Sequence, residues 1–104
     1  MKFYKNLYIG NTIKDPKRIM RKIKYHAKQL KIFVIMLSPG SDQLEICHSM
    51  LLRQPYYKKK ENLPFIIGIA GNYEEAVELV CQITKEAVAQ NGNADLKRYL
   101  FPES

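Results

Sequence analysis

The chain has 104 residues, of which 46% are hydrophobic, and this is enough for one domain with a single core but not for two. We therefore assign residues 1–104 to one domain. The start of the chain alternates polar and apolar residues, which excludes the unbroken apolar core of a signal peptide. The longest apolar run, residues 32–37, is far shorter than the roughly 20 residues that cross a membrane. These features predict a cytoplasmic protein without a membrane partner.

The positive charge is concentrated in the first part of the chain. Residues 1–60 carry 14 Lys and Arg against 3 Asp and Glu, whereas residues 61–104 carry 3 against 7. The net charge of +7 therefore divides into +11 and −4. Such an imbalance indicates a polyanion or an acidic protein surface as the partner, although it says nothing about the fold.

The two cysteines, Cys47 and Cys81, lie far apart, and neither belongs to a CxxC motif or a Cys/His cluster. This spacing excludes a disulfide framework and argues against a zinc site. Both residues are predicted to be small buried thiols. We expect no metal and no cofactor.

The first two elements are a strand and a helix. Residues 3–9 alternate and contain aromatic side chains, so they predict a strand that Gly10 ends. Asp15 and Pro16 predict a helix start, because Asp caps helices well and Pro at the first position lacks only a donor that would be unpaired anyway. The helix should run to about residue 29. Its apolar side chains fall on one stripe, at Ile19, Met20, Ile23, Ala27 and Leu30.

The middle of the chain predicts a hairpin. Residues 32–37 are apolar without alternation, which is typical of a central strand that is covered on both faces. The turn residues 38–42 lead into residues 43–52, which alternate and predict the return strand. Residues 53–63 contain a proline and several lysines and are expected to form a polar connection.

The last strand and helix follow. Residues 65–70 predict a second strand that is apolar on both faces, and residues 73–90 predict a long helix. Asn72 is its expected N-cap, and Glu75 falls where it completes a capping box. This carboxylate would repel a phosphate, so the sequence favours capping over anion binding at this helix end. The remaining residues form a short tail.

These elements predict an α+β fold of two layers in the order β-α-β-β-β-α, with a four-stranded mixed sheet, two helices on one face and a short C-terminal tail. The first β-α-β unit is expected to be a right-handed crossover between parallel neighbours, and the middle strands to pair as antiparallel hairpins. Two helices cover only one face of the sheet. A second copy of the chain would cover the other, so the sequence predicts a homodimer.

A basic row on the first helix is the candidate nucleic-acid-binding site. Its residues recur at spacings of four, three and four, opposite the apolar stripe, and the row spans about 16 Å, comparable to a few successive phosphates. The row is a solvated helix face, a nucleic-acid-binding surface or a docking surface for an acidic protein. The lack of interspersed Glu keeps the polyanion hypothesis open. Arg18 and Lys22 widen the row, whose members are Lys17, Arg21, Lys24 and Lys28.

Two further clusters give weaker signals. The segment 56–60, Tyr-Tyr-Lys-Lys-Lys, combines aromatic rings and cations as single-stranded nucleic-acid-binding segments do, but such tyrosines more often pack over an edge strand. His48 lies near Glu45 and Cys47 in sequence, yet strand alternation places it on the opposite face from both. We assign no catalytic residue.

The sequence thus predicts a small intracellular, non-enzymatic binding or regulatory module that acts as a homodimer on a ligand it does not identify. The alternative is a nucleic-acid-associated protein that uses the basic first helix. An enzyme built around His48 is a third hypothesis.

Overall fold

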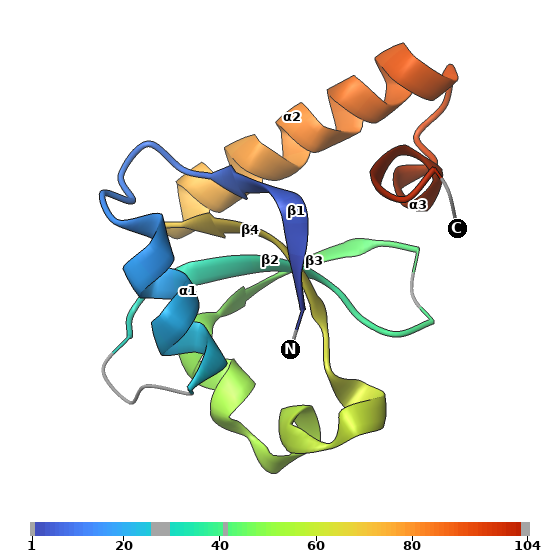
Figure 1. The fold of residues 1–104 in the computed structure, drawn as a ribbon. Coiled ribbons are helices and arrows are strands. Elements are labelled where there is room, and N and C mark those ends of the chain that lie inside the picture. The colour runs from blue at the N-terminus through green and yellow to red at the C-terminus, as the bar shows by residue number, and fades with distance from the viewer. Residues whose placement is uncertain (1, 26–29, 41, 103–104) are drawn as a thin grey trace.

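The computed structural model describes residues 2–25, 30–40 and 42–102 and confirms the predicted fold class. It is an α+β fold with a four-stranded mixed sheet and helices packed against it, in the order β-α-β-β-β-α (Figure 1). A short helix, which the sequence did not predict, follows near the C-terminus. The elements are β1 (Lys2–Ile9), α1 (Pro16–Lys24), β2 (Phe33–Leu37), β3 (Leu44–His48), the 3-10 helices η1 (Ser49–Arg53), η2 (Pro55–Lys58) and η3 (Lys60–Asn62), β4 (Phe65–Ala70), α2 (Tyr73–Asn91) and α3 (Leu96–Leu100).

The strand order is β1-β4-β2-β3, which differs from the predicted pairing of the first strands. β1 is parallel to β4, and β2 is antiparallel to both β4 and β3, so the β2–β3 hairpin is confirmed. The prediction that β1 and β2 are parallel neighbours is wrong, because β4 lies between them. The burial patterns explain this order: β4 is apolar on both faces and gains from two neighbours, whereas β1 exposes Lys2 and Lys5 and suits an edge.

β2 supplies side chains to two separate cores, because successive side chains of a strand point to opposite faces. Val34 and Met36 belong to the first core, together with Ile23 of α1. Ile35 and Leu37 belong to the second core. We call the side of the sheet that carries α1 the α1 face, and the other side the α2 face.

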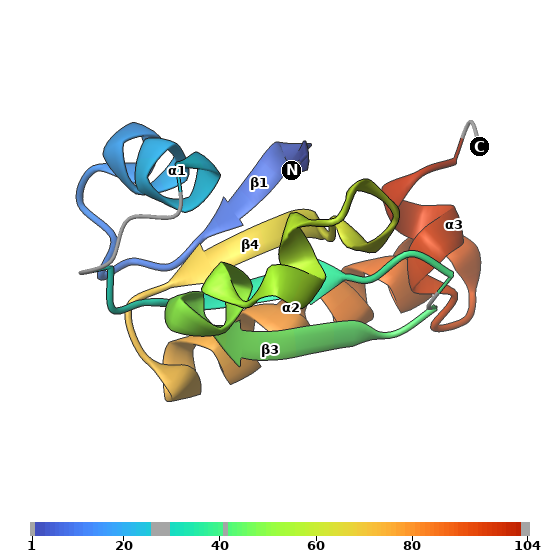
Figure 2. The same ribbon diagram turned by 90° about the horizontal axis from the view of Figure 1, so that it is seen from below.

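α2 and α3 cover the α2 face. Ala76 and Ile83 of α2 are fully buried there, and Leu100 of α3 is almost fully buried beside them. Figure 2 shows α2 behind the sheet and the 3-10 helices in front of it, and Figure 1 shows α1 on the same side as the 3-10 helices. α1 and α2 therefore lie on opposite faces of the sheet. The prediction of a two-layer fold had placed both helices on one face. Since β2 and β4 are apolar on both faces, each face needs its own cover.

The rest of the α1 face is covered by the segment after β3. The predicted return strand ends early, at His48, and three 3-10 helices follow it. The hydroxyl of Ser49 donates to the carbonyl of Leu30 at 2.6 Å and accepts from the amide of Ile32 at 3.2 Å, which turns the chain away from the sheet. Leu52 is 2% exposed in the first core, and Tyr57 packs against that core. Leu52 of η1 and Tyr57 of η2 thus help to cover the sheet, although η2 and η3 bury none of their residues.

This arrangement contradicts the reason for predicting a homodimer. The homodimer was predicted because a single chain was expected to leave one apolar face of the sheet open. α1 and the 3-10 helices cover one face of β2 and β4, and α2 and α3 cover the other. A second copy is therefore not needed to bury the sheet.

The predicted helix caps are confirmed. The Asp15 carboxylate accepts from the amide of Arg18 at 3.2 Å, with Pro16 as the first helical residue. Asn72 accepts from the amide of Glu75 at 2.8 Å, and Gly92, with φ of 78°, ends α2 in the left-handed conformation. α1 ends at Lys24, where the sequence predicted about residue 29; residues 26–29 lie outside the described part.

Candidate anion-binding cleft

A cleft of about 520 Å³ lies between α1 and the junction of β4 with α2. It is shaped by the loop after β1, one side of α1, the two residues before β2 and the first residues after β4. Its described lining consists of Thr12, Ile13, Lys14, Asp15, Arg18, Ile19, Lys22, Lys31, Ile32, Gly71 and Asn72.

Four cations and one carboxylate line this cleft, so its formal charge is +3. Arg18 and Lys22 come from one side of α1, because residues four apart in a helix lie above one another. Lys14 and Lys31 come from the loops on either side of that helix. The carboxylate, Asp15, is already engaged in capping α1. The cleft is therefore arranged to attract an anion.

Glu75 fixes the far wall of the cleft. Its carboxylate accepts from the Thr12 hydroxyl at 2.6 Å, from the Thr12 amide at 3.1 Å and from the Gly71 amide at 2.8 Å. These hydrogen bonds, the one from the Thr12 hydroxyl above all, lower the pKa of Glu75 below its usual range. Because a carboxylate occupies this end of α2, an anion in the cleft would be held by the Lys and Arg side chains and not by the helix terminus.

Two glycines permit the close approach of the loop after β1 to the start of α2. A Cβ at Gly10 would collide with the Glu75 carboxylate, and one at Gly71 would collide with the Thr12 hydroxyl. Gly10, which the sequence marked only as a strand end, and Gly71 therefore let the loop after β1 lie against the start of α2. The predicted capping by Asn72 is confirmed. In a closed capping box the Glu75 carboxylate would accept from the Asn72 amide, but here it accepts from Gly71 and Thr12.

The predicted basic row lies outside the cleft. Lys17, Arg21 and Lys24 are exposed on α1, and none of them lines the cavity. Lys28, the fourth member of the row, lies outside the described residues. The structure instead gathers the two residues that widened the row, Arg18 and Lys22, with cations from outside the helix. A helical periodicity analysis could not find Lys14 and Lys31, because neither belongs to α1.

A second basic segment lies on the same face of the sheet. Tyr57 packs against the first core, and its ring meets the ring of Tyr56 edge-on, with centroids 5.0 Å apart. Tyr57 thus holds this segment against the sheet. Tyr56 is 59% exposed, and three lysines follow the two tyrosines in sequence. The α2 face has the opposite sign, since α2 carries four glutamates and one lysine. The two faces of the sheet therefore differ in charge.

The possible catalytic residues are not brought together. His48 accepts from the Met50 amide at 3.1 Å through Nδ1, and its ring meets Phe33 edge-on. Cys47 is buried beside Met36, and burial raises the pKa of its thiol to about 11. Cys81, predicted to be buried, is exposed on α2. Within residues 2–25, 30–40 and 42–102, no three His, Cys, Asp or Glu side chains could together hold a metal ion.

A polar cluster that the sequence did not reveal joins β1, α2 and α3. The Tyr8 hydroxyl donates to Glu86 Oε1 at 2.5 Å, and the Tyr99 hydroxyl donates to the same oxygen at 3.0 Å. Burial, followed by the hydrogen bond to Glu86, raises the pKa of Tyr8 strongly. Through Glu86 the two hydroxyl groups tie β1 and α3 to α2.

Comparison with protein-family models, curated proteins and solved structures finds no significant match to this chain. In the described part, no helix is both long and apolar enough to cross a membrane.

Proposed function

We propose that this protein is a non-enzymatic binding module whose ligand is nucleic acid, held mainly through its backbone phosphates. The observation that carries the proposal is the cleft with four cations and one engaged carboxylate. Neutralising phosphates with Lys and Arg releases condensed counterions, and this supplies much of the affinity of nucleic-acid-binding proteins. Among the three hypotheses drawn from the sequence, this cleft supports the nucleic-acid-associated protein best.

The spacing of the cations favours a repeating polyanion. Beyond the cleft, the exposed Lys17, Arg21 and Lys24 extend over about 10 Å of helix, a length that matches neighbouring phosphates of one strand. A single small anion would use the cleft and leave these residues without a role. A chain of phosphates could use both.

Exposed tyrosines beside the cations also fit a nucleic-acid ligand. Tyr25, at the end of α1, is 73% exposed, and the Lys24 ammonium lies 6.0 Å from its ring centroid. Tyr56 is similarly exposed among the lysines of residues 58–60. Aromatic rings that stand among cations can stack with bases while the cations contact the backbone.

The test compares two pairs of neutralising substitutions in the same helix. R18Q/K22Q removes two cations from the cleft, and K17Q/R21Q removes two at the same spacing from the outer row. Glutamine keeps the helix propensity close to that of Lys and Arg. Binding of a fluorescein-labelled 20-nucleotide single strand and of the corresponding duplex is measured by fluorescence anisotropy at about 50 mM salt.

We expect R18Q/K22Q to weaken binding by at least about tenfold and K17Q/R21Q by about threefold, because each removed phosphate contact lowers the affinity. K85Q, which removes one cation from α2 on the opposite face, should leave binding unchanged. Equal losses for the two helix pairs would show that the cleft is not the centre of the site. No binding by the wild-type protein would refute the proposed function.

A further inference from the structure

A second cavity, of about 430 Å³, lies at the other end of β4 from the basic cleft. It is formed where β1 and β4 begin and β2 ends, and β4 separates it from the cleft by about 20 Å of strand. Segments far apart in the sequence meet there. The lining consists of Lys2, Leu37, Ser38, Pro39, Gly40, Lys60, Leu63, Pro64, Phe65, Lys97 and Phe101.

The floor of this cavity is apolar. Leu37 and Pro64 are buried, and the rings of Phe65 and Phe101 meet edge-on with centroids 4.8 Å apart. The cavity volume lies within the range of pockets that hold small organic molecules, which are mostly apolar with a few polar groups. An apolar ring or a short alkyl chain could thus be removed from water here.

Three lysines stand at the rim of this floor, and none of the described lining residues is acidic. Lys2 comes from β1, Lys60 from η3 and Lys97 from α3. Lysine stems often lie over apolar surface and so cover it. Here the cavity stays open with all three side chains in place, so the lysines do not fill it.

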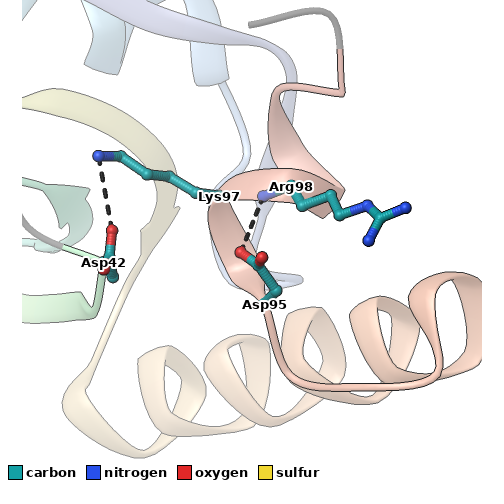
Figure 3. A network of polar contacts seen from close by, with 4 residues as sticks. All are labelled: Asp42, Asp95, Lys97 and Arg98. Carbon is teal, nitrogen blue, oxygen red and sulfur yellow. Dashed lines mark hydrogen bonds and ion pairs between the residues drawn. The ribbon is translucent and has the colours of Figure 1, made fainter.

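Lys97 is held only weakly in its present position. Its Nζ lies 3.5 Å from Asp42 Oδ1, and both side chains are largely exposed, at 47% and 83%. Such an exposed ion pair contributes little to stability, so a competing carboxylate could replace Asp42 as the partner. Figure 3 shows that Lys97 and Arg98 leave α3 in opposite directions, with Lys97 reaching toward Asp42.

We propose that this cavity binds a small organic carboxylate with an apolar body. The apolar floor takes the ring or alkyl chain, and the carboxylate lies among Lys2, Lys60 and Lys97. The lysines supply charge complementarity, while the floor selects against small hydrophilic anions. The described linings of this cavity and of the basic cleft have no residue in common, although Lys60 also belongs to the lysine segment proposed to contact nucleic acid.

The first test titrates the isotope-labelled wild-type protein with octanoate and, separately, with octanol. We expect saturable changes at the backbone amides of Leu37, Leu63 and Phe101, and an affinity for octanoate at least about tenfold above that for octanol, because only the anion meets the lysines. Equal affinities, shifts at other places, or no saturable shift up to about 10 mM octanoate would overturn the proposal.

The second test uses two double variants that remove the same charge from the same segments. K60Q/K97Q removes two rim lysines, and K59Q/R98Q removes the neighbouring cations that do not line the cavity. The first should weaken octanoate binding at least about fivefold without changing octanol binding, and the second should change neither. Equal effects of the two variants would overturn the proposal. R18Q/K22Q should retain octanoate binding, which separates this result from the outcome for nucleic acid.

Discussion

The hydroxyl of Thr12 donates a 2.6 Å hydrogen bond to Glu75, 63 residues further along the chain. The contact fastens the loop between β1 and α1 to the first turn of α2, which packs on the other face of the sheet. Thr12 and Gly71, both bonded to Glu75, line the basic cleft. The position of the cleft wall therefore depends on one carboxylate.

That carboxylate should make stability depend on pH. Its pKa is lowered in the folded state, so its contribution is present above the unfolded pKa of about 4.3 and is lost as the pH falls through the folded value. We expect the denaturation midpoint of the wild-type protein to fall between about pH 5 and pH 3 more steeply than that of E75Q. The matched variant E78Q, on an exposed position of α2, should follow the wild-type curve. Parallel curves for wild type and E75Q would show that the bonds to Thr12 and Gly71 contribute nothing.

The two thiols should differ in reactivity. Cys47 is buried, and burial together with Glu45 raises the pKa of its thiol to about 11, so little thiolate forms at neutral pH. Cys81 is exposed on α2. An aromatic disulfide reagent should modify one thiol rapidly in the native protein and the second only after denaturation. The variant C81S should lose the rapid phase, and a rapid phase that survived in C81S would contradict the buried position of Cys47.

The mass in solution should be that of one chain. Both faces of β2 and β4 are covered by the helices of a single chain, and the structural reason for the predicted homodimer is therefore absent. Light scattering at micromolar concentration should give about 12.1 kDa. A mass of twice this value, with no dependence on salt, would show that a surface other than the sheet faces mediates self-association.

The sequence predicted the local structure better than the arrangement of its elements. Alternation, caps and turn residues located the strands and helices, because each depends on residues a few positions apart. The position of β4 between β1 and β2 depends on pairing between distant segments, which no local pattern records. Ser49 likewise ended β3 early through bonds to Leu30 and Ile32, and this contact has no local signature.

The same limit applies to the candidate site. Helical periodicity placed Arg18 and Lys22 next to a basic row, but the cleft also needs Lys14 and Lys31, which are brought near α1 by the path of the chain on either side of it. Periodicity ranks the residues of one element by the direction in which they point. It cannot find a concave surface that is built from several elements.

The salt dependence of nucleic-acid binding gives the most direct measure of the cleft. If Lys14, Arg18, Lys22 and Lys31 each neutralise one phosphate, the cleft alone should contribute about −3 to −4 for duplex DNA, and about −3 for a single strand, to the slope of log affinity against log salt concentration. Contacts of the outer row with phosphates would make the total slope steeper. R18Q/K22Q should reduce the magnitude of this slope by about 2, because two fewer counterions are released. Strands of different sequence should bind with similar affinity, since phosphate contacts carry no base information. A slope near zero with measurable affinity would mean that the contacts are not made to phosphates, and the role assigned to the cleft would then be wrong.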